Sequence, residues 1–180
     1  FPSAVAAWSL KGEDFLKDNT TVSEMKLRLG WGQTGQQEGV ADYGYFANYS
    51  MSNVVNGSFY DTAKDGYLAR PNAYNPALKW ETTTTTNVGI DLAMFNNRLE
   101  FTAEWYKNKS EDLLYSVPVP AQTGVSNTAV TMNAASMENS GFEFSATYRN
   151  HDHAFKYDIS ANLSTLKNKV TSLGFGTESY

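Results

Sequence analysis

Apolar and polar residues alternate along several stretches of the chain with a period of two residues. Successive side chains of a β-strand point to opposite faces of its sheet, so this alternation predicts strands with one apolar and one polar face. The alternating stretches are 25–31, 88–94, 99–106 with a possible extension to about 115, 142–149 and 155–164. A sixth, weaker strand is predicted from about Ser3 to Leu10, where Ala4, Ala6 and Trp8 share a face. We therefore expect an all-β chain of about six or more strands.

The predicted connections alternate between short and long. Asn96 and Asn97 form a tight hairpin turn between two alternating stretches, because asparagine tolerates the positive φ that such turns need. A second short turn is predicted from Asn150 to His153, whereas residues 34–78 and 116–137 form long polar loops. Residues 11–24 interrupt the strands and predict one or two helical turns. Short turns at one end of the strands and long loops at the other are typical of outer-membrane β-barrels.

Composition is compatible with that architecture and excludes several others. The 180 residues carry a formal net charge of -5 and scattered basic residues, which argues against a nucleic-acid surface. The chain has no cysteine, so disulfides and thiolate metal sites are excluded. No stretch approaches the roughly 18 apolar residues of a membrane helix, but barrel strands need about 9 to 11 alternating residues and never form such runs. The aromatic content of 14% fits the aromatic girdles of barrels.

Residue placement along the strands leaves two fold interpretations open. Phe95, Tyr148, Phe155 and Tyr157 lie near the short-turn end, where they would form part of a periplasmic aromatic girdle or the edge of a soluble core. The polar face suits a water-filled lumen and would equally suit the outside of a β-sandwich. Its charged residues are Lys26, Arg28, Asp91, Glu100, Glu104, Glu143, Arg149, Lys156 and Asp158.

Several motifs make the chain similar to a known family. Phe1-Pro2-Ser3 and Trp8 are followed by Leu27-Arg28 and by Gly32-Gln33-Thr34-Gly35. Further matches are Asn75 to Thr83, then Asn87, Gly89, Asp91 and Phe95 to Leu99, then Trp105-Tyr106, Asp112-Leu113-Leu114, Pro118 to Gly124, Asn133, and Met137 to Glu143. In this order and spacing the chain resembles the C-terminal barrel half of SusC/RagA-type TonB-dependent transporters of the Bacteroidetes.

The resemblance implies an antiparallel up-and-down transmembrane β-barrel in the outer membrane of a Gram-negative bacterium. It implies a barrel of about 22 strands closed by an N-terminal plug. Such a transporter imports oligosaccharides or peptides, is energised through TonB and works with a SusD-like surface lipoprotein. We expect residues 1–180 to be a fragment of the barrel domain without the plug, because about six strands leave two open edges.

Candidate chemistry in the chain favours binding over catalysis. His151-Asp152-His153 places two imidazoles in a short turn without a third ligand, so a solvated turn is favoured over a metal site. Glu100 and Glu104 share a strand face but lie about 13 Å apart along it, beyond glycosidase spacings. We expect no enzyme activity and no cofactor. Tyrosines of the first long loop offer flat rings with a hydroxyl for substrate contact, namely Tyr43, Tyr45, Tyr49, Tyr60, Tyr67 and Tyr74.

Two rival functions remain at this point. The first is a secreted or surface-attached β-sandwich that binds glycans, which would bury its apolar faces between two sheets. The second is a non-transport barrel, such as an adhesin or an outer-membrane enzyme, which needs a catalytic constellation or a repetitive passenger. The sequence contains neither of those features.

Overall fold

The computed structural model describes residues 1–40, 42–53, 67–152 and 154–173, and in them β-strands dominate. The strands are β1 (Ser3–Ser9), β2 (Val22–Gln36), β3 (Tyr49–Asn53), β4 (Tyr67–Pro71), β5 (Glu81–Met94), β6 (Leu99–Pro118), β7 (Ala129–Asn150) and β8 (Tyr157–Ser172). Two 3₁₀ turns, η1 (Leu10–Gly12) and η2 (Ala121–Thr123), accompany them. In the described ranges, no helix has the length and apolar character needed to cross a membrane.

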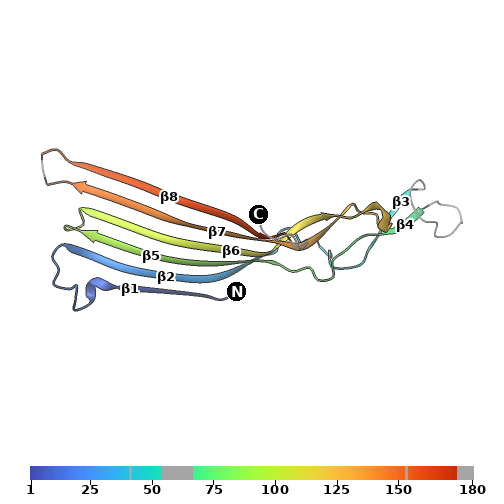
Figure 1. The fold of residues 1–180 in the computed structure, drawn as a ribbon, viewed down its shortest axis with the longest axis horizontal. Coiled ribbons are helices and arrows are strands. Elements are labelled where there is room, and N and C mark those ends of the chain that lie inside the picture. Colours follow the sequence, from blue (N-terminus) through green and yellow to red (C-terminus); the bar gives the residue numbers. More distant parts are fainter. Residues whose placement is uncertain (41, 54–66, 153, 174–180) are drawn as a thin grey trace. The chain divides into compact units, whose positions relative to one another are not determined.

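Six of the strands form one antiparallel sheet in the order β1-β2-β5-β6-β7-β8 (Figure 1). This order is the up-and-down arrangement that the sequence predicted. The register of β1 against β2 places Ala4 opposite Trp31, Ala6 opposite Leu29 and Trp8 opposite Leu27. β3 and β4 form a separate two-stranded antiparallel hairpin. The hairpin lies inside the predicted first long loop, where the sequence analysis expected no strand.

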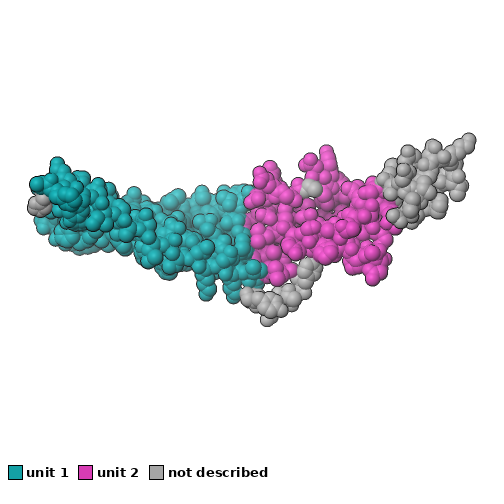
Figure 2. Space-filling view, turned by 90° about the horizontal axis from the view of Figure 1, so that it is seen from above, with its two compact units in different colours: residues 1–35, 83–110, 137–171 teal, residues 36–82, 111–136, 172–180 magenta. Residues whose placement is uncertain are grey.

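The chain divides into two compact units, coloured teal and magenta in Figure 2. Unit 1 comprises residues 1–35, 83–110 and 137–171, and unit 2 comprises residues 36–82, 111–136 and 172–180. In unit 1 the β1–β2, β5–β6 and β7–β8 connections lie at the same end of the sheet (Figure 1). This common end is the arrangement that the alternation of short and long connections predicted.

The sheet in unit 1 has two chemically different faces, as the alternation predicted. The polar face is defined here by Arg28, Asn87, Asp91, Glu100, Thr102, Glu104, Thr147, Arg149, Asp158 and Ser160. Hydrogen bonds or ion pairs across strands join Arg28 to Asp91 and Glu104, Asp91 to Thr102, Glu104 to Asn87, Glu100 to Arg149, and Thr147 to Ser160. The apolar face is defined by the residues between them, which include Leu29, Trp31, Val88, Phe101, Phe142, Phe144, Tyr148, Tyr157, Ile159 and Leu163. Two faces of opposite character need two different environments.

The apolar face is not covered within the described part of the chain. Of the large side chains on it, Phe142 is 49% exposed, Ile159 61% and Leu163 63%. The buried hydrophobic residues that the structure describes are Ala93 and Ala134. A β-sandwich would enclose such a face against a second sheet, so its exposure contradicts the sandwich interpretation. An exposed apolar surface of this kind marks an interface with a partner or with a membrane.

Two connections are shorter than predicted because strands extend into them. The second long loop is shorter than predicted, because β6 continues to Pro118 and β7 already begins at Ala129. The segment of predicted helical turns contains η1 and a single turn in which Lys17 N donates to Glu13 O at 2.8 Å, and β2 begins at Val22. These strands extend beyond the clearly alternating stretches because backbone pairing with neighbours continues where side-chain alternation has faded.

The β5–β6 turn confirms the role predicted for its asparagines. Asn96 and Asn97 have φ values of 54° and 63°, and Phe95 has a φ of 55°. The turn spans residues 95–98, so it is longer than two residues, and Arg98 N donates to Phe95 O at 3.3 Å. The positive φ of Phe95 is tied to a hydrogen bond from its N–H to Thr21 O at 2.8 Å, which joins this turn to the start of β2.

Candidate functional site

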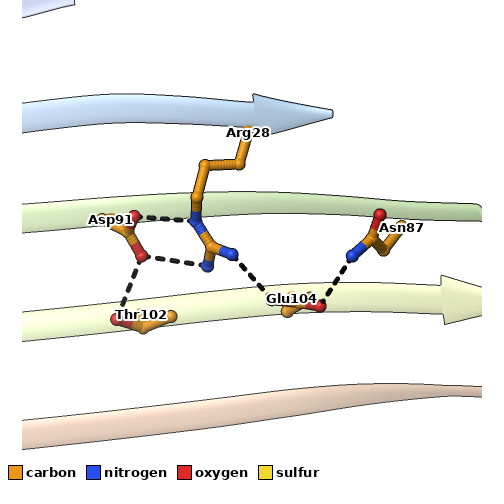
Figure 3. A network of polar contacts seen from close by, with 5 residues as sticks. All are labelled: Arg28, Asn87, Asp91, Thr102 and Glu104. Carbon is orange, nitrogen blue, oxygen red and sulfur yellow. Dashed lines mark hydrogen bonds and ion pairs between the residues drawn. The ribbon is translucent and has the colours of Figure 1, made fainter. Parts of the chain in front are cut away.

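An ion-pair network lies on the polar face of unit 1 and joins three adjacent strands (Figure 3). Arg28 of β2 binds Asp91 of β5 through two bonds, Nε to Oδ2 at 2.8 Å and Nη2 to Oδ1 at 3.1 Å. The third guanidinium nitrogen, Nη1, donates to Glu104 Oε2 of β6 at 3.1 Å. Two-bond contact fixes the plane of the guanidinium and orients it across the strands. The network therefore holds β2, β5 and β6 in one register.

Polar neighbours complete the hydrogen bonding of both carboxylates. Thr102 Oγ1 donates to Asp91 Oδ1 at 3.3 Å, and Asn87 Nδ2 donates to Glu104 Oε1 at 3.3 Å (Figure 3). The side chains of Arg28, Asp91 and Glu104 are 34%, 33% and 26% exposed. Because they are partly exposed, the pairs contribute modestly to stability, about 1 kcal/mol or less each. With one cation and two anions, the network carries a formal charge of -1.

Two glycines make room for this network. A Cβ atom on Gly89 would lie 2.8 Å from Arg28 Nη2, and one on Gly30 would lie 2.0 Å from Asn87 Oδ1. The Arg28 and Asn87 side chains can therefore lie flat over the sheet only where the neighbouring strand has no side chain of its own. Glycine at a strand interior commonly marks such a close approach.

A second glycine-dependent contact joins β6, β7 and β8. Tyr106 lies over Gly141, since a Cβ there would be 2.8 Å from the tyrosine Oη and 2.0 Å from Thr165 O. Next to it, Phe142 N donates to the side-chain oxygen of Thr165 at 3.0 Å. Covering a strand glycine with an aromatic ring is a recurrent way to restore packing at such a position. Sequence reasoning assigned no role to Gly141, although it lies within the Met137–Glu143 motif.

The two glutamates considered as an acid pair have separate cationic partners. Glu104 binds Arg28, and Glu100 binds Arg149 Nη1. Both lie on the polar face, as predicted. Each carboxylate is engaged with an arginine on a different strand, Glu104 with one on β2 and Glu100 with one on β7, so the pair does not form the shared site that glycoside hydrolysis requires.

The predicted short turn at residues 150–153 is held by a hydrogen bond and an ion pair. His151 Nε2 and Asp158 Oδ1 are 2.6 Å apart, and Asp152 binds Arg98 of the β5–β6 turn. His153 lies outside the described residues. Among the residues that are described, no group of three or more His, Cys, Asp or Glu side chains could hold a metal ion. The two hairpin turns are therefore fastened to each other by charge.

Aromatic rings gather on the apolar face and near the short turns. Phe101 and Phe144 stack with ring centroids 6.4 Å apart, and Phe142 and Phe144 stack at 6.2 Å. Close to the β7–β8 turn, Tyr157 contacts Tyr148 at 6.2 Å and Phe155 at 5.7 Å. Phe95 is 50% exposed in the neighbouring turn. The structure thus places all four predicted girdle residues at the short-turn end.

The loop tyrosines of unit 2 are exposed where the structure describes them. Tyr43, Tyr45, Tyr49 and Tyr74 are 71%, 48%, 68% and 44% exposed. Tyr43 and Tyr45 contact Phe46, with ring centroids 6.5 Å and 4.4 Å apart. Tyr60 lies outside the described residues, and the side chain of Tyr67 does as well, although its backbone belongs to β4. Tyr43, Tyr45 and Phe46 therefore form a local cluster of partly exposed aromatic rings.

Comparison with known proteins decides the family. The family model "TonB dependent receptor-like, beta-barrel" matches residues 1–179. The chain belongs to this TonB-dependent receptor family. The TonB-dependent receptor SusC of Bacteroides thetaiotaomicron is 40% identical over 99% of this chain, and the TonB-dependent receptor P3 of Formosa agariphila is 37% identical over 99%. The chain spans 18% and 17% of the length of these two relatives.

Solved structures agree with that family membership. The RagAB peptide importer in its closed-closed state matches 97% of this chain and 18% of its own, with a TM-score of 0.77 and 26% sequence identity. The open-open state of the same importer matches 99% of the chain with the same TM-score and identity. The resemblance to SusC/RagA-type TonB-dependent receptors and the antiparallel barrel architecture are therefore confirmed.

Family membership gives the two faces of this TonB-dependent receptor segment their meaning. The relatives named above are receptors and a peptide importer and not enzymes, in agreement with the prediction of no enzymatic activity. In a β-barrel the outward face is apolar and the inward face polar. The Arg28 network thus belongs to the lumen side of the wall, and the stacked phenylalanines belong to the outer side.

Proposed function

We propose that residues 1–180 form six adjacent strands and connected extracellular loops in the barrel domain of an outer-membrane transporter that imports oligosaccharides or peptides by TonB-dependent uptake. The observation that carries this proposal is the two-faced sheet of unit 1, which has uncovered aromatic and aliphatic side chains on one face and a charged network on the other. That pairing suits a wall between lipid and an aqueous lumen.

Strand length supports a membrane-spanning role. A barrel strand needs about 9 to 11 residues to cross the bilayer at its usual tilt. β2, β5, β6, β7 and β8 have 15, 14, 20, 22 and 16 residues, so each exceeds this requirement. Strands this long leave residues beyond the hydrocarbon layer, which is where extracellular loops begin in such barrels.

The orientation of the chain follows from its turns. The short β5–β6 and β7–β8 turns are assigned to the periplasmic side, where barrel turns are short, and the longer β1–β2 connection lies at the same end of the sheet. The tyrosine-bearing segments of unit 2 are then assigned to the extracellular side, where an incoming substrate first meets the protein. Exposed tyrosine rings can stack on sugar rings or grip peptide side chains. Tyr43, Tyr45, Tyr49, Tyr60, Tyr67 and Tyr74 are proposed as substrate-contact residues.

The partners of the intact protein are also proposals. The identity with SusC and the likeness to the RagAB importer support assembly with a SusD-like surface lipoprotein and energy supply through TonB. Those relatives also support an outer-membrane location. The apolar face of unit 1 would contact the lipid. No metal or cofactor is needed for this function, since it consists of binding and gating.

The proposal is tested with the full-length parent protein in its own host. After detergent extraction of the outer membrane, we expect it to copurify with a SusD-type lipoprotein. Intact cells should take up at least one member of a panel of dye-labelled gluco-, manno- and xylo-oligosaccharides and casein peptides. Uptake should stop when the parent gene is deleted. A protein found in the soluble fraction, or an unchanged uptake in the deletion strain, would overturn the proposal.

A matched pair of variants tests the loop tyrosines. Replacing both Tyr43 and Tyr45 by alanine removes two exposed rings from unit 2, whereas Phe15→Ala removes a ring that is 70% exposed at the short-turn end. The first variant should raise the KM of uptake several-fold at unchanged surface amount, and the second should leave it unchanged. Equal effects of the two variants would remove the case for these tyrosines as contact residues.

A further inference from the structure

A strap of nine residues, 72–80, connects β4 to β5 in unit 2 and is bound by two asparagine side chains. Asn127 accepts a hydrogen bond from Ala73 N at 2.6 Å and donates from Nδ2 to Ala73 O at 2.9 Å and to Ala129 O at 2.8 Å. All three bonds join the side-chain amide of Asn127 to backbone groups. The amide therefore binds both backbone groups of one strap residue, as a neighbouring strand would.

Asn133 repeats the same pattern at the other end of the strap. Its Oδ1 accepts from Lys79 N at 2.8 Å, and its Nδ2 donates to Lys79 O at 2.9 Å and to Asp112 O at 2.7 Å. Each asparagine lies 54 residues after the strap residue that it binds. The strap thus follows the start of β7 in the same direction, and the two amides fix it six residues apart.

Other contacts hold the chain just before the strap and between these two points. Ser126 N donates to Pro71 O at 2.8 Å, just before the strap begins. In its middle, Asn75 Oδ1 accepts from Ala77 N at 3.0 Å and Asn75 O accepts from Leu78 N at 3.3 Å, which closes a turn at Pro76. Side chains and one turn therefore fix the backbone that a β-ladder does not.

Each clamped residue directly precedes an exposed aromatic residue. Ala73 precedes Tyr74, which is 44% exposed, and Lys79 precedes Trp80, which is 52% exposed. Fixing the backbone at position i limits where the side chain at i+1 can point. Rings that are ordered before a ligand arrives lose less conformational entropy when the ligand binds. The pattern of clamp and aromatic residue occurs at both ends of the strap.

We propose that Asn127 and Asn133 are positioning residues that hold Tyr74 and Trp80 ready for contact with the imported substrate. This inference rests on the proposed transport function and adds Trp80 to the contact residues. The two asparagines do not touch substrate themselves. They act by fixing the backbone of Ala73 and Lys79.

The clamp itself is tested without any substrate. In the full-length protein, a spin label on Ala77→Cys reports the mobility of the strap, because Ala77 is exposed between the two amides. Asn127→Asp and Asn133→Asp keep the accepting oxygen but lose both N–H donors and place a carboxylate beside carbonyl oxygens. Each should raise the label's mobility at least twofold. Gln122→Glu, which makes the same change of amide to carboxylate at an exposed site of η2, should leave it unchanged. An unaltered spectrum in both asparagine variants overturns the clamp.

The contact role is tested by kinetics with whichever dye-labelled oligosaccharide or casein peptide of the panel is taken up. Asn127→Asp should raise KM about tenfold with the maximal rate within twofold. In a Tyr74→Ala background the same substitution should raise KM less than twofold further, since the ring that it positions is gone. Asn127→Gln, which restores both donors, should recover part of the loss. Equal effects in the two backgrounds overturn the positioning role.

The spin-label experiment and the uptake kinetics distinguish a failure of this inference from a failure of the proposed function. If the parent protein takes up no member of the panel, the transport proposal fails together with the contact role, while the spin label still decides whether the amides fix the strap. If uptake occurs but the label and KM do not respond to either asparagine variant, the inference fails and the transport proposal stands.

Discussion

Units 1 and 2 reach order by different means. In unit 1, neighbouring strands pair along their length, and side chains add cross-strand ion pairs such as Arg28 with Asp91 and Glu104. In unit 2, amide side chains such as Asn127 and Asn133 bind backbone groups outside any ladder. Unit 2 also contains the β3–β4 ladder and the ends of β6 and β7, but its connecting segments depend on such single residues. The wall of unit 1 is stabilised by strand pairing and by the environment on each of its faces. Substitutions in unit 1 should therefore change stability, and those in unit 2 should change uptake.

The largest effect is expected for a charge on the apolar face of unit 1. Leu163→Arg places a guanidinium on the apolar face of β8, six residues beyond the girdle residue Tyr157, and should destabilise the folded barrel by about 2–4 kcal/mol. Asn162→Arg, on the polar face of the same strand, should cost less than about 0.5 kcal/mol. Urea unfolding of the full-length protein in lipid vesicles measures both. Equal costs would mean that the two faces meet the same environment.

A smaller loss is expected at the glycine below Tyr106. Gly141→Ala adds a Cβ that would meet Thr165 O and the tyrosine ring, so the strands must shift at a cost of about 1–3 kcal/mol. Gly12→Ala is the matched control, because its Cβ would meet nothing within 4 Å. It should change stability by less than about 0.5 kcal/mol. An unaffected Gly141→Ala protein would show that this contact does not restrict β7 and β8.

The ion-pair network around Arg28 should contribute less to the free energy of unfolding than the contact at Gly141. Arg28→Leu leaves Asp91 and Glu104 without their cation, and we expect a loss of about 1 kcal/mol that shrinks at high salt. Lys26→Leu removes a cation two residues away on the same strand and should be nearly neutral. Unfolding at low and high ionic strength distinguishes the two. A loss that is independent of salt would assign the effect of Arg28 to packing.

The smallest effect on stability is expected in unit 2. Tyr43→Ala should change the free energy of unfolding by less than about 0.5 kcal/mol, because the side chain is 71% exposed. It should still raise the KM of uptake, as proposed above. A destabilisation of more than about 1 kcal/mol would show that this ring has a structural role. It would contradict the expectation that substitutions in unit 2 change uptake and not stability.

The sequence predicted the sheet better than the loops for a physical reason. Alternation of side chains is a local pattern, and it located the strands around Leu29, Ile90, Phe101, Phe144 and Ile159, all of which the structure confirms. The strands of the β3–β4 hairpin have only five residues each and lie in a long polar stretch, and the start of β7 is rich in small and polar residues, so both were assigned to loops. These segments form strands because they pair with neighbouring strands, and the sequence of one segment does not show which strand it pairs with.

The same distinction between local patterns and long-range contacts applies to the candidate site residues. The sequence placed Arg28, Asp91 and Glu104 on one face. It could not show that Arg28 binds both carboxylates, because Asp91 lies 63 residues and Glu104 lies 76 residues further along the chain. Asn133 was noted within a family motif without a role. Its function as a clamp depends on Lys79 and Asp112 lying beside it, which is a fact of tertiary structure.

The sequence by itself determined the class of the protein, its strands and the chemistry of their two faces, because period-two alternation and turn residues act locally. Tertiary structure alone decided the pairing of β2 with β5, which glycines leave room for Arg28 and Tyr106, and which asparagines hold the strap. Those features arise from contacts between residues distant in the chain, whose meeting depends on register and on how the loops close. Local residue patterns do not determine the register of the strands or the way in which the loops bring distant residues together.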